Sequence, residues 1–436
     1  MATETKIPFD QQYVRTFSSG HGEPDWLTAR RLEALALAER LPLPKPEKTK
    51  IDKWNFTEFA RHAVDSAPYA DLNGLPEAVK ALIEAGEGTK NLYVQRNHTP
   101  AYVSLSAELK EKGVIFTDMF TAAREHGDLL KRYWMTAVKP DEHRLAALHA
   151  ALFNGGVFVY VPKNVEIETP LQAVYIQDED DIALFNHVII VAEDNSRVVF
   201  VENYVSASGE GKAVVNVVAE VFAEANASVF FAAVDHLAKG TTTYVNRRGI
   251  AGRDGRIEWA LGLMNDGNTV SENITRLVGD GSIGDAKTVA VSRGEQVQNV
   301  TTSVIHYGKH TEGTILKHGV VRDSATSIFN GIGKIEHGAS KSNAEQESRV
   351  LMLSEKARGD ANPILLIDED DVMAGHAASV GRIDPIQLYY LMSRGIPRRD
   401  AERLIIHGFL APVVEAIPIE GVKNQLIEVI ERKVQS

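Results

Sequence analysis

A repeat of about 31 residues constrains the possible folds of this chain more than any other feature of its sequence. Residues 192–200 resemble residues 223–231, at an offset of 31. Further points at which a turn precedes a strand fall at Gly255 and Asp285, at offsets of 29 and 30. Self-similarity with such a period is typical of a solenoid, in which each coil stacks on the next. The repeat therefore favours a parallel β-helix, whose coils contribute short strands and stack their inward apolar side chains in rows.

The repeat lies in a central region, residues 151–367, that is rich in strand-forming residues. Short β-branched and aromatic runs, such as 157–161, 187–191 and 197–201, alternate with turns of Gly, Asn and Asp. No convincing long helical pattern interrupts them. Short strands separated by turn signals also fit a β-sandwich, which stays open as the alternative.

Residues 1–150 are predicted to be mostly helical. An amphipathic run follows Asp25 and stops at the proline-rich connector 41–46, where proline removes backbone donors and favours extended chain. Its predicted inner face carries Leu27, Arg31, Ala34, Leu35 and Ala38. The rest of this region predicts strands at 91–94 and 101–105, and helices near 118–134 and 141–153.

Residues 368–436 are predicted to form a C-terminal helical region. Asp384 can cap a helix whose first residue is Pro385, and Gly395 can end it. Pro397 opens a second helix, and a last helix would follow. Apolar residues of that last helix share one face, namely Val422, Leu426, Val429 and Ile430. Such short helices are not stable alone, so they must pack on something.

The composition excludes several classes of protein. A net charge of −12 disfavours the binding of nucleic acids and of anionic membrane surfaces. No apolar run is long enough to span a bilayer, and the N-terminus lacks the apolar core of a signal peptide. We therefore expect a cytoplasmic protein of two or three folding units, since 436 residues exceed one usual core.

The chain contains no cysteine. Disulfides, a thiol nucleophile and any thiolate metal site built from this chain alone are thereby excluded. Candidate metal ligands must be histidines or carboxylates.

Two groups of histidines are candidates. His306, His310, His318 and His337 lie close together in the sequence, and a metal site across adjacent coils is possible, although surface or hydrogen-bonded histidines are more common. His376 is the other candidate, because small neighbours leave its imidazole accessible and an acidic run, 368–371, precedes it. Neutral imidazole is a common ligand of iron and zinc. A merely polar histidine in a tight turn is the alternative interpretation.

Several motifs resemble the SufD branch of the SufB/SufD family, which belongs to the SUF machinery of iron–sulfur cluster assembly. The resemblance covers nearly the whole length. The matching motifs are Glu23-Pro24-Asp25-Trp26-Leu27, Trp54-Asn55-Phe56, Ser327-Ile328-Phe329-Asn330-Gly331, the segments 343–352 and 361–365, Asp371-Val372 through Asp384, and 388–396.

The resemblance implies a right-handed parallel β-helix between helical N- and C-terminal regions. It also implies a cytoplasmic complex with the paralogue SufB and the ABC-type ATPase SufC. The C-terminal helices would receive the ATPase, with Tyr389, Tyr390, Arg394 and Phe409 as candidate contacts. His376 matches a family histidine at the SufB–SufD pairing interface, where the nascent cluster is thought to form.

The resemblance also gives the missing cysteine a meaning, because iron–sulfur clusters are normally held by thiolates. Some relatives carry cysteine just before the matched histidine, where this chain has Met373, Ala374 and Gly375. Thiolates would have to come from the partner. We therefore expect a non-enzymatic scaffold that holds no cofactor stably alone and shares transient iron or a nascent cluster with a partner. The alternatives are a homodimeric scaffold acting without SufB and a carbohydrate-active β-helix enzyme.

Overall fold

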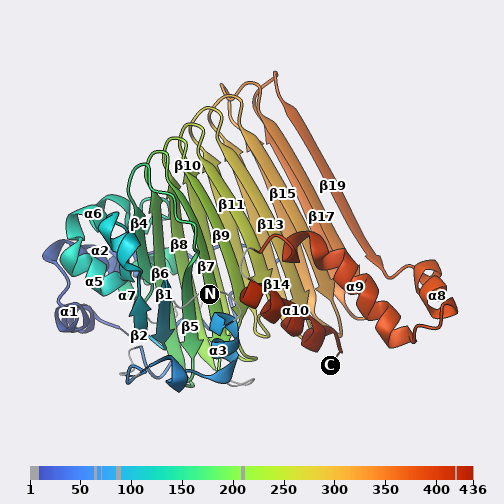
Figure 1. Cartoon of the computed structure of the whole chain (residues 1–436), viewed down its shortest axis with the longest axis horizontal. Helices are drawn as coiled ribbons and strands as arrows, with labels where there is room; N and C mark the ends of the chain where they lie inside the picture. Colours follow the sequence, from blue (N-terminus) through green and yellow to red (C-terminus); the bar gives the residue numbers. More distant parts are fainter. Residues whose placement is uncertain are drawn as a thin grey trace.

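The protein is a two-sheeted β-solenoid of about eight turns with helices at both ends of the chain. The computed structural model describes residues 9–62, 66–69, 71–84, 90–207, 212–417 and 420–435. From residue 157 onward, successive strands alternate between two sheets that face each other (Figure 1). Apart from two short antiparallel pairs near the N-terminus, neighbouring strands pair in parallel. The predicted parallel β-helix is thus confirmed and the β-sandwich is wrong.

The first sheet, called sheet 1, contains ten strands and the second, sheet 2, contains nine. The strands of sheet 1 are β19 (Met373–Arg382), β17 (Asn343–Met352), β15 (Glu312–Val321), β13 (Ile283–Ser292), β11 (Arg256–Leu263), β9 (Ser228–His236), β7 (Arg197–Ser206), β5 (Leu171–Gln177), β1 (Leu92–Arg96) and β2 (Thr99–Ser104). The strands of sheet 2 are β18 (Arg358–Ile367), β16 (Thr326–Ile335), β14 (Val297–His306), β12 (Thr269–Leu277), β10 (Thr242–Ala251), β8 (Ala213–Ala223), β6 (Ile182–Ala192), β4 (Val157–Val161) and β3 (Ile115–Asp118).

Helices flank the solenoid at both termini. Those of the N-terminal region are α1 (Gln11–Gly20), α2 (Asp25–Arg40), the 3-10 turn η1 (Leu72–Gly74), α3 (Glu77–Glu84), α4 (Ala107–Glu111), α5 (Met119–Glu125), α6 (Gly127–Tyr133) and α7 (Arg144–Leu152). The C-terminal helices are α8 (Pro385–Ser393), α9 (Arg398–Val414) and α10 (Glu420–Gln435). No helix in the described residues is long and apolar enough to cross a membrane.

The sequence repeat arises from a ladder of asparagines at one row of turns. Asn164, Asn195 and Asn226 occupy equivalent places in three successive coils, and each has a positive φ of 55–60°. Asparagine tolerates this left-handed conformation better than most residues. The Asn226 side chain donates a hydrogen bond to the Asn195 side chain, and the Asn195 side chain donates one to Asn164, both at 3.0 Å. The offset of 31 residues is therefore the length of one coil.

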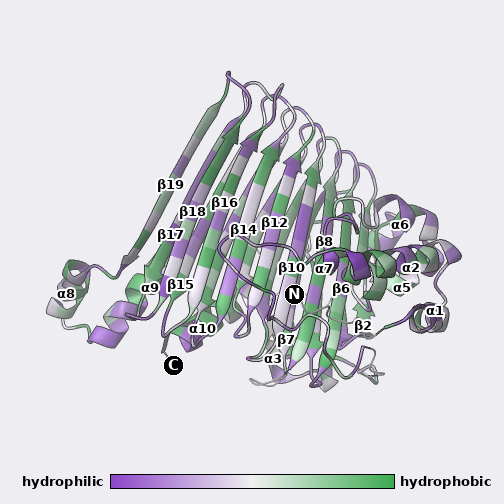
Figure 2. Ribbon diagram, turned by 180° about the vertical axis from the view of Figure 1, so that it is seen from behind, coloured by the Kyte–Doolittle hydropathy of each residue, from purple (hydrophilic) through white to green (hydrophobic). Residues whose placement is uncertain are grey.

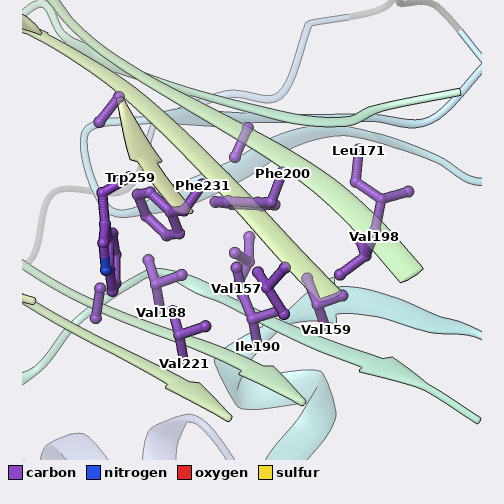
Figure 3. Close-up of a cluster of buried hydrophobic side chains, with 14 of the residues drawn as sticks. Val157, Val159, Leu171, Val188, Ile190, Val198, Phe200, Val221, Phe231 and Trp259 are labelled. Atoms are coloured by element: carbon purple, nitrogen blue, oxygen red, sulfur yellow. The ribbon is translucent and has the colours of Figure 1, made fainter. Parts of the chain in front are cut away.

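Apolar side chains fill the N-terminal half of the interior. Leu171, Phe200, Phe231 and Trp259 occupy one row on consecutive strands of sheet 1, in exact register. The rings of Phe200 and Phe231 lie 5.3 Å apart, and those of Phe231 and Trp259 lie 5.0 Å apart. Figure 3 shows these side chains pointing towards valines and isoleucines of sheet 2. Such stacking accounts for the apolar positions that recur every coil.

Helices α1, α2, α5, α6 and α7 cover the outer face of sheet 2 at its first strands, and α3 packs on sheet 1. Helix α2 buries Leu27, Arg31, Ala34, Leu35 and Ala38, which is the inner face predicted from the sequence. Arg31 is fully buried because its guanidinium pairs with Glu23 at 2.5 Å and lies over the Phe153 ring.

A buried polar network fastens these helices to the sheet. The Glu220 carboxylate on β8 accepts hydrogen bonds from the backbone N–H groups of Met135, Ala137 and Val138, at 2.7–3.1 Å. His187 on β6 contacts the same carboxylate at 2.9 Å. Each of these otherwise unpaired backbone donors is thereby satisfied, as burial requires.

The C-terminal helices α9 and α10 pack on the outer face of sheet 1 through Ile406, Leu410, Leu426 and Val429, among others. Helix α8 lies beyond the last strand, as the view from behind also shows (Figure 2). Asp384 caps α8 as predicted, because its carboxylate accepts the N–H of Ile386 at 2.8 Å. Helix α9 begins directly after Pro397, again as predicted.

Two boundaries differ from the sequence prediction. Residues 373–382, placed in the C-terminal helical region, form strand β19, so the strands extend past residue 367 to Arg382. This strand lacks an apolar alternation because it buries neither face, and its pairing comes from β17 alone. The helix expected over 118–134 is split into α5 and α6 at His126, whose φ of −127° is not helical. The expected strands near 91–94 and 101–105 are β1 and β2.

Candidate functional site

The C-terminal end of the solenoid is open. Strands β18 and β19 end their sheets, and neither has a second neighbouring strand in the described residues. Every residue of β19 is exposed. The exposed fraction is 38% for Ile367 and 43% for Val380, and both side chains belong to the inward-facing rows of their strands. An uncovered solenoid end presents both free backbone groups and apolar interior side chains, which is the usual signature of an interaction surface.

His376 lies in the middle of β19 and is exposed. It is in register with Gln346 of β17, whose side chain is buried in the interior and donates to the carbonyl of Ile364 on the facing sheet. Because in-register neighbours of a parallel sheet point to the same face, the His376 imidazole belongs to the inward-facing row. It is therefore accessible only through the open end and not through the side of the solenoid.

The accessibility of His376 does not come from its small neighbours, as the sequence was interpreted. A side chain at Gly375 would meet no atom within 4 Å, so glycine is not needed there to leave space. The exposure follows from the place of β19 at the end of its sheet. The preceding acidic run does not converge on the imidazole either, since Asp371 lies five residues away, about 16 Å along an extended strand. Glu369 instead accepts backbone N–H groups of its own turn and of Gly338.

The two free edges differ in their hydrogen-bonding capacity. On β19 the N–H of Met373 bonds to Ser342, so alternate residues, including His376 and Ala378, point their N–H groups away from β17. On β18 the N–H of Arg358 bonds to Ala325, which puts Pro363 among the residues that face the free edge. Proline has no N–H to offer. The edge of sheet 1 can therefore continue a ladder of hydrogen bonds, whereas the edge of sheet 2 is interrupted at its centre.

A groove of about 600 Å³ lies next to the open end, between β17, β19, α8 and α9. Apolar side chains line it, including Leu388, Ile406 and Val434. Its other lining residues include Arg382, Arg398, Arg399, Arg403 and Glu402. Four guanidinium groups against one carboxylate give the groove a positive potential, which favours an acidic partner surface with apolar side chains.

The four candidate docking residues take two different positions. Tyr389 and Tyr390 are 72% and 56% exposed on α8, and the Arg394 guanidinium lies over the Tyr390 ring. Phe409 on α9 instead packs inward, with its ring 4.8 Å from the His318 ring. Phe409 thus fixes α9 on sheet 1 rather than presenting its ring to solvent.

Sequence reasoning missed part of this exposed surface. Ile386 is 76% exposed on α8 and Leu404 is 49% exposed on α9, and neither was singled out. The sequence could have indicated the exposure of Ile386, because a residue directly after Pro385 lies outside the buried face of a short capped helix.

The structure does not bring the other four histidines together. His306 is buried at the end of β14 and contacts Thr311, while His318 contacts the carbonyl of Phe409 on the outer face of sheet 1. His310 and His337 lie in two different turns. Across the described residues, no three histidine or acidic side chains are grouped so as to hold a metal ion.

The sequence matches two family profiles. Residues 175–409 match the profile described as SUF system FeS cluster assembly, SufBD core domain. Residues 89–173 match the SufBD protein N-terminal region. The boundary between the two falls in β5, near the start of the parallel coils.

Similar proteins carry the same assignment. An iron–sulfur cluster assembly protein SufD of Bacillus subtilis is 67% identical over 437 residues, covering 100% of both chains. An iron–sulfur cluster assembly SufBD family protein of Staphylococcus haemolyticus is 28% identical, over 94% of this chain and 90% of its own length. One from Staphylococcus saprophyticus is 27% identical with the same coverage.

Proposed function

Because the chain belongs to the SufBD family of the SUF iron–sulfur cluster assembly system, we propose that it is a non-catalytic scaffold subunit of a SufBCD-type complex in the cytoplasm. In this proposal its open end pairs with a SufB-like paralogue and its C-terminal helices receive a SufC-like ATPase. The observation that carries the proposal is the open end itself, which leaves apolar interior side chains and free backbone donors in solvent.

The edge of β19 supports pairing through sheet 1. Five of its ten residues direct their N–H groups to the free edge, whereas the neighbouring edge of β18 carries Pro363. A partner strand beside β19 would satisfy these groups and cover the exposed Met373 and Val380. Main-chain hydrogen bonds would supply affinity, and contacts with the inward-facing side chains of β19 would supply specificity.

His376 is the proposed contribution of this chain to the shared site. Its imidazole lies in the inward row at the open end, so a partner strand would bring its own side chains against it. The cluster is the cargo of the complex, and its thiolate ligands would come from the partner because this chain has no cysteine. His376 would act there as a ligand or would handle a proton, and this chain alone would hold no cofactor stably.

The groove beside α8 and α9 is the proposed docking site for the ATPase. Its arginines share the groove with Tyr389 of α8, and Ile386 and Tyr390 are exposed on the same helix. Because α9 also packs on sheet 1, a force applied at the groove would reach the strands next to the open end.

The pairing is tested by placing proline at the free edge. Ala378→Pro would remove one outward N–H of β19, whereas Ala377→Pro would remove an N–H that bonds to β17. We expect Ala378→Pro to fold and to weaken association with a SufB-like subunit at least about tenfold, since several hydrogen bonds and their register depend on that edge. Association would be measured by native mass spectrometry of the chain mixed with SufB- and SufC-like proteins.

Three outcomes decide the matter. Ala377→Pro should destabilise the free chain, which checks the assignment of N–H directions. Unchanged association of a folded Ala378→Pro variant would refute pairing through β19. A stable dimer of the chain alone that persists when a SufB-like subunit is added would favour the homodimeric scaffold instead.

The His376 site has a separate test. His376→Ala should leave folding and complex assembly intact and should lower cluster formation in cells that lack other assembly systems. His376→Gln, which keeps a polar side chain of similar reach but is a poor iron ligand, separates ligation from simple polarity. Full cluster yield in both variants would eliminate the site while leaving the pairing proposal standing.

The carbohydrate-active alternative has little support. It requires a groove with paired carboxylates or with basic residues suited to an acidic sugar, and the groove at α8 and α9 contains a single glutamate. Its arginines would suit an acidic sugar, but the family assignment concerns cluster assembly. Incubation of the purified chain with polyuronides would reveal any such activity as released product.

A further inference from the structure

Lys317 is buried inside the solenoid and forms no ion pair with any of the described residues. It lies on β15 and its side chain is fully buried. Its Nζ donates to the carbonyl of Val300, at 3.1 Å, and to the carbonyl of Asn330, which are both on strands of the facing sheet 2. Burial is the sole cause that lowers the pKa of this amine well below its ordinary value of 10.5. A neutral amine has two protons, and these two carbonyls accept both of them, so its lone pair is left free.

Among the residues that the structure describes, three hydroxyl groups on strands around Lys317 have no hydrogen-bond partner. Thr288 on β13 and Ser348 on β17 are the in-register neighbours of Lys317 on either side. Thr302 on β14 follows Val300 by two residues and shares its inward face. All three hydroxyl oxygens are buried and unpartnered. Buried polar groups of folded proteins are normally hydrogen-bonded, so these three hydroxyls can bind an enclosed molecule, whether water or a solute.

The surroundings of Lys317 are rich in donors and free of opposing charge. On the fully described strands β13, β14, β16 and β17, His306 is the one other titratable side chain that faces inward, and burial lowers its pKa to about 4. The remaining charged groups of the interior, Arg247, Glu202 and Asp235, pair with one another at 2.7 and 3.0 Å on earlier coils. An ammonium group here would therefore be uncompensated, and so would an anion alone, but the two together would be neutral.

We propose that Lys317, Thr288, Thr302 and Ser348 form an internal site for a small monovalent anion, which binds together with a proton taken up by the Lys317 amine. The third N–H of the ammonium and the three hydroxyls would then all donate to the anion. Ser348 is in register with Ala378 of β19, so the site lies two strands inside the open end of sheet 1. The anion would enter from that end, which the small side chains of Ala374 and Ala378 leave open.

The proposal is tested on the full-length chain with azide and bromide as probes. Azide added at pH 8 in weakly buffered solution should cause an uptake of about one proton per bound azide, because the proposal pairs each bound anion with a proton on the Lys317 amine. The infrared stretch of bound azide should shift from its position in water. A crystal soaked in bromide should show anomalous scattering beside Lys317 Nζ.

Matched variants keep the test decisive. Lys317→Met has a similar length and no charge, so it should fold, and it should abolish both the proton uptake and the shifted azide band. Thr288→Val, which keeps the shape of the side chain, should weaken azide binding about threefold to tenfold through the loss of one donor. Lys334→Met on β16 is the control, because Lys334 is partly exposed and pairs with Glu336.

Two results would overturn the proposal. The first is azide binding and proton uptake that persist in a folded Lys317→Met variant. The second is a bromide-soaked crystal with only water beside Lys317 and the three hydroxyls. Neither result depends on a SufB-like partner or on cluster assembly, so the fate of this site is separate from the fate of the proposed scaffold function.

Discussion

The two ends of the solenoid differ in what covers them. At the N-terminal end the antiparallel pairs β1–β2 and β3–β4 close the sheets, and helices cover the outer face through a network centred on Glu220. At the C-terminal end β19 is exposed along its whole length. The same parallel coil runs through both. The comparison teaches that in this fold the interior stabilises the chain at one end and is available for association at the other.

The largest expected difference between the two ends is in the free energy of unfolding that a core substitution costs. Phe200→Ala empties one place in the stacked row of the closed interior, where Phe200 is fully buried between Leu171 and Phe231. We expect a loss of about 3–5 kcal/mol in the free energy of unfolding. Val380→Ala at the open end should cost the free chain less than about 0.5 kcal/mol. Urea denaturation followed by circular dichroism measures both, and equal losses would show that the open end is covered in solution.

The second effect concerns the pH dependence of the closed interior. Burial raises the pKa of Glu202 to about 7 from an ordinary 4.5, although Arg247 opposes the shift. Between these two pH values the folded chain holds a proton that the unfolded chain releases, so stability falls as the pH rises from 4.5 through about 7. Glu202→Gln removes this titration. The stability of the wild type relative to this variant should therefore fall by about 3 kcal/mol across that window.

This difference between wild type and variant is the quantity to measure, because other groups titrate nearby. Burial also lowers the pKa of His143, His236 and His306 to about 4, which weakens the fold as the pH falls below 6.5. These terms cancel when the two proteins are compared at each pH. A difference that stays constant from pH 4.5 to 8 would show that Glu202 is ionised throughout.

The smallest expected effect is on the local stability of helix α8 at the open end. Asp384→Ala removes the cap of α8 and should cost about 1 kcal/mol locally. Helix α8 buries only Leu388 among its residues, so the loss should leave global unfolding unchanged. Hydrogen exchange of the amides of residues 386–393 should instead become about fivefold faster. A lower global stability would mean that α8 folds as one unit with the strands.

The parts of the fold that the sequence predicted are those in which local and tertiary signals agree. The similarity of residues 192–200 to 223–231 predicted the coil, and its asparagines serve both the left-handed turn and the ladder. The inner face of α2 was predicted residue by residue, since burial follows the helical period. The cap at Asp384 is equally local.

Strand β19 was not predicted because it has no buried face to leave an apolar pattern in its sequence. For the same reason the exposure of His376 was attributed to its small neighbours and not to its place at a sheet edge. Lys317 was missed for a different reason. Its neighbours Thr288 and Ser348 lie about 30 residues away on either side, so only the register brings them together.

The antiparallel cap at the N-terminal end has a consequence for the size of any assembly. In the terms of polymer chemistry, a solenoid with two open ends is a bifunctional monomer and grows without limit. Leu109 of α4 and Phe116 of β3 pack against the interior of the first coil, so this chain would be monofunctional, with one exposed end. Joining two such chains end to end consumes both reactive ends and terminates growth. Under the proposed pairing, a finite complex would therefore follow from the way in which the chain begins its first coil, far from strand β19.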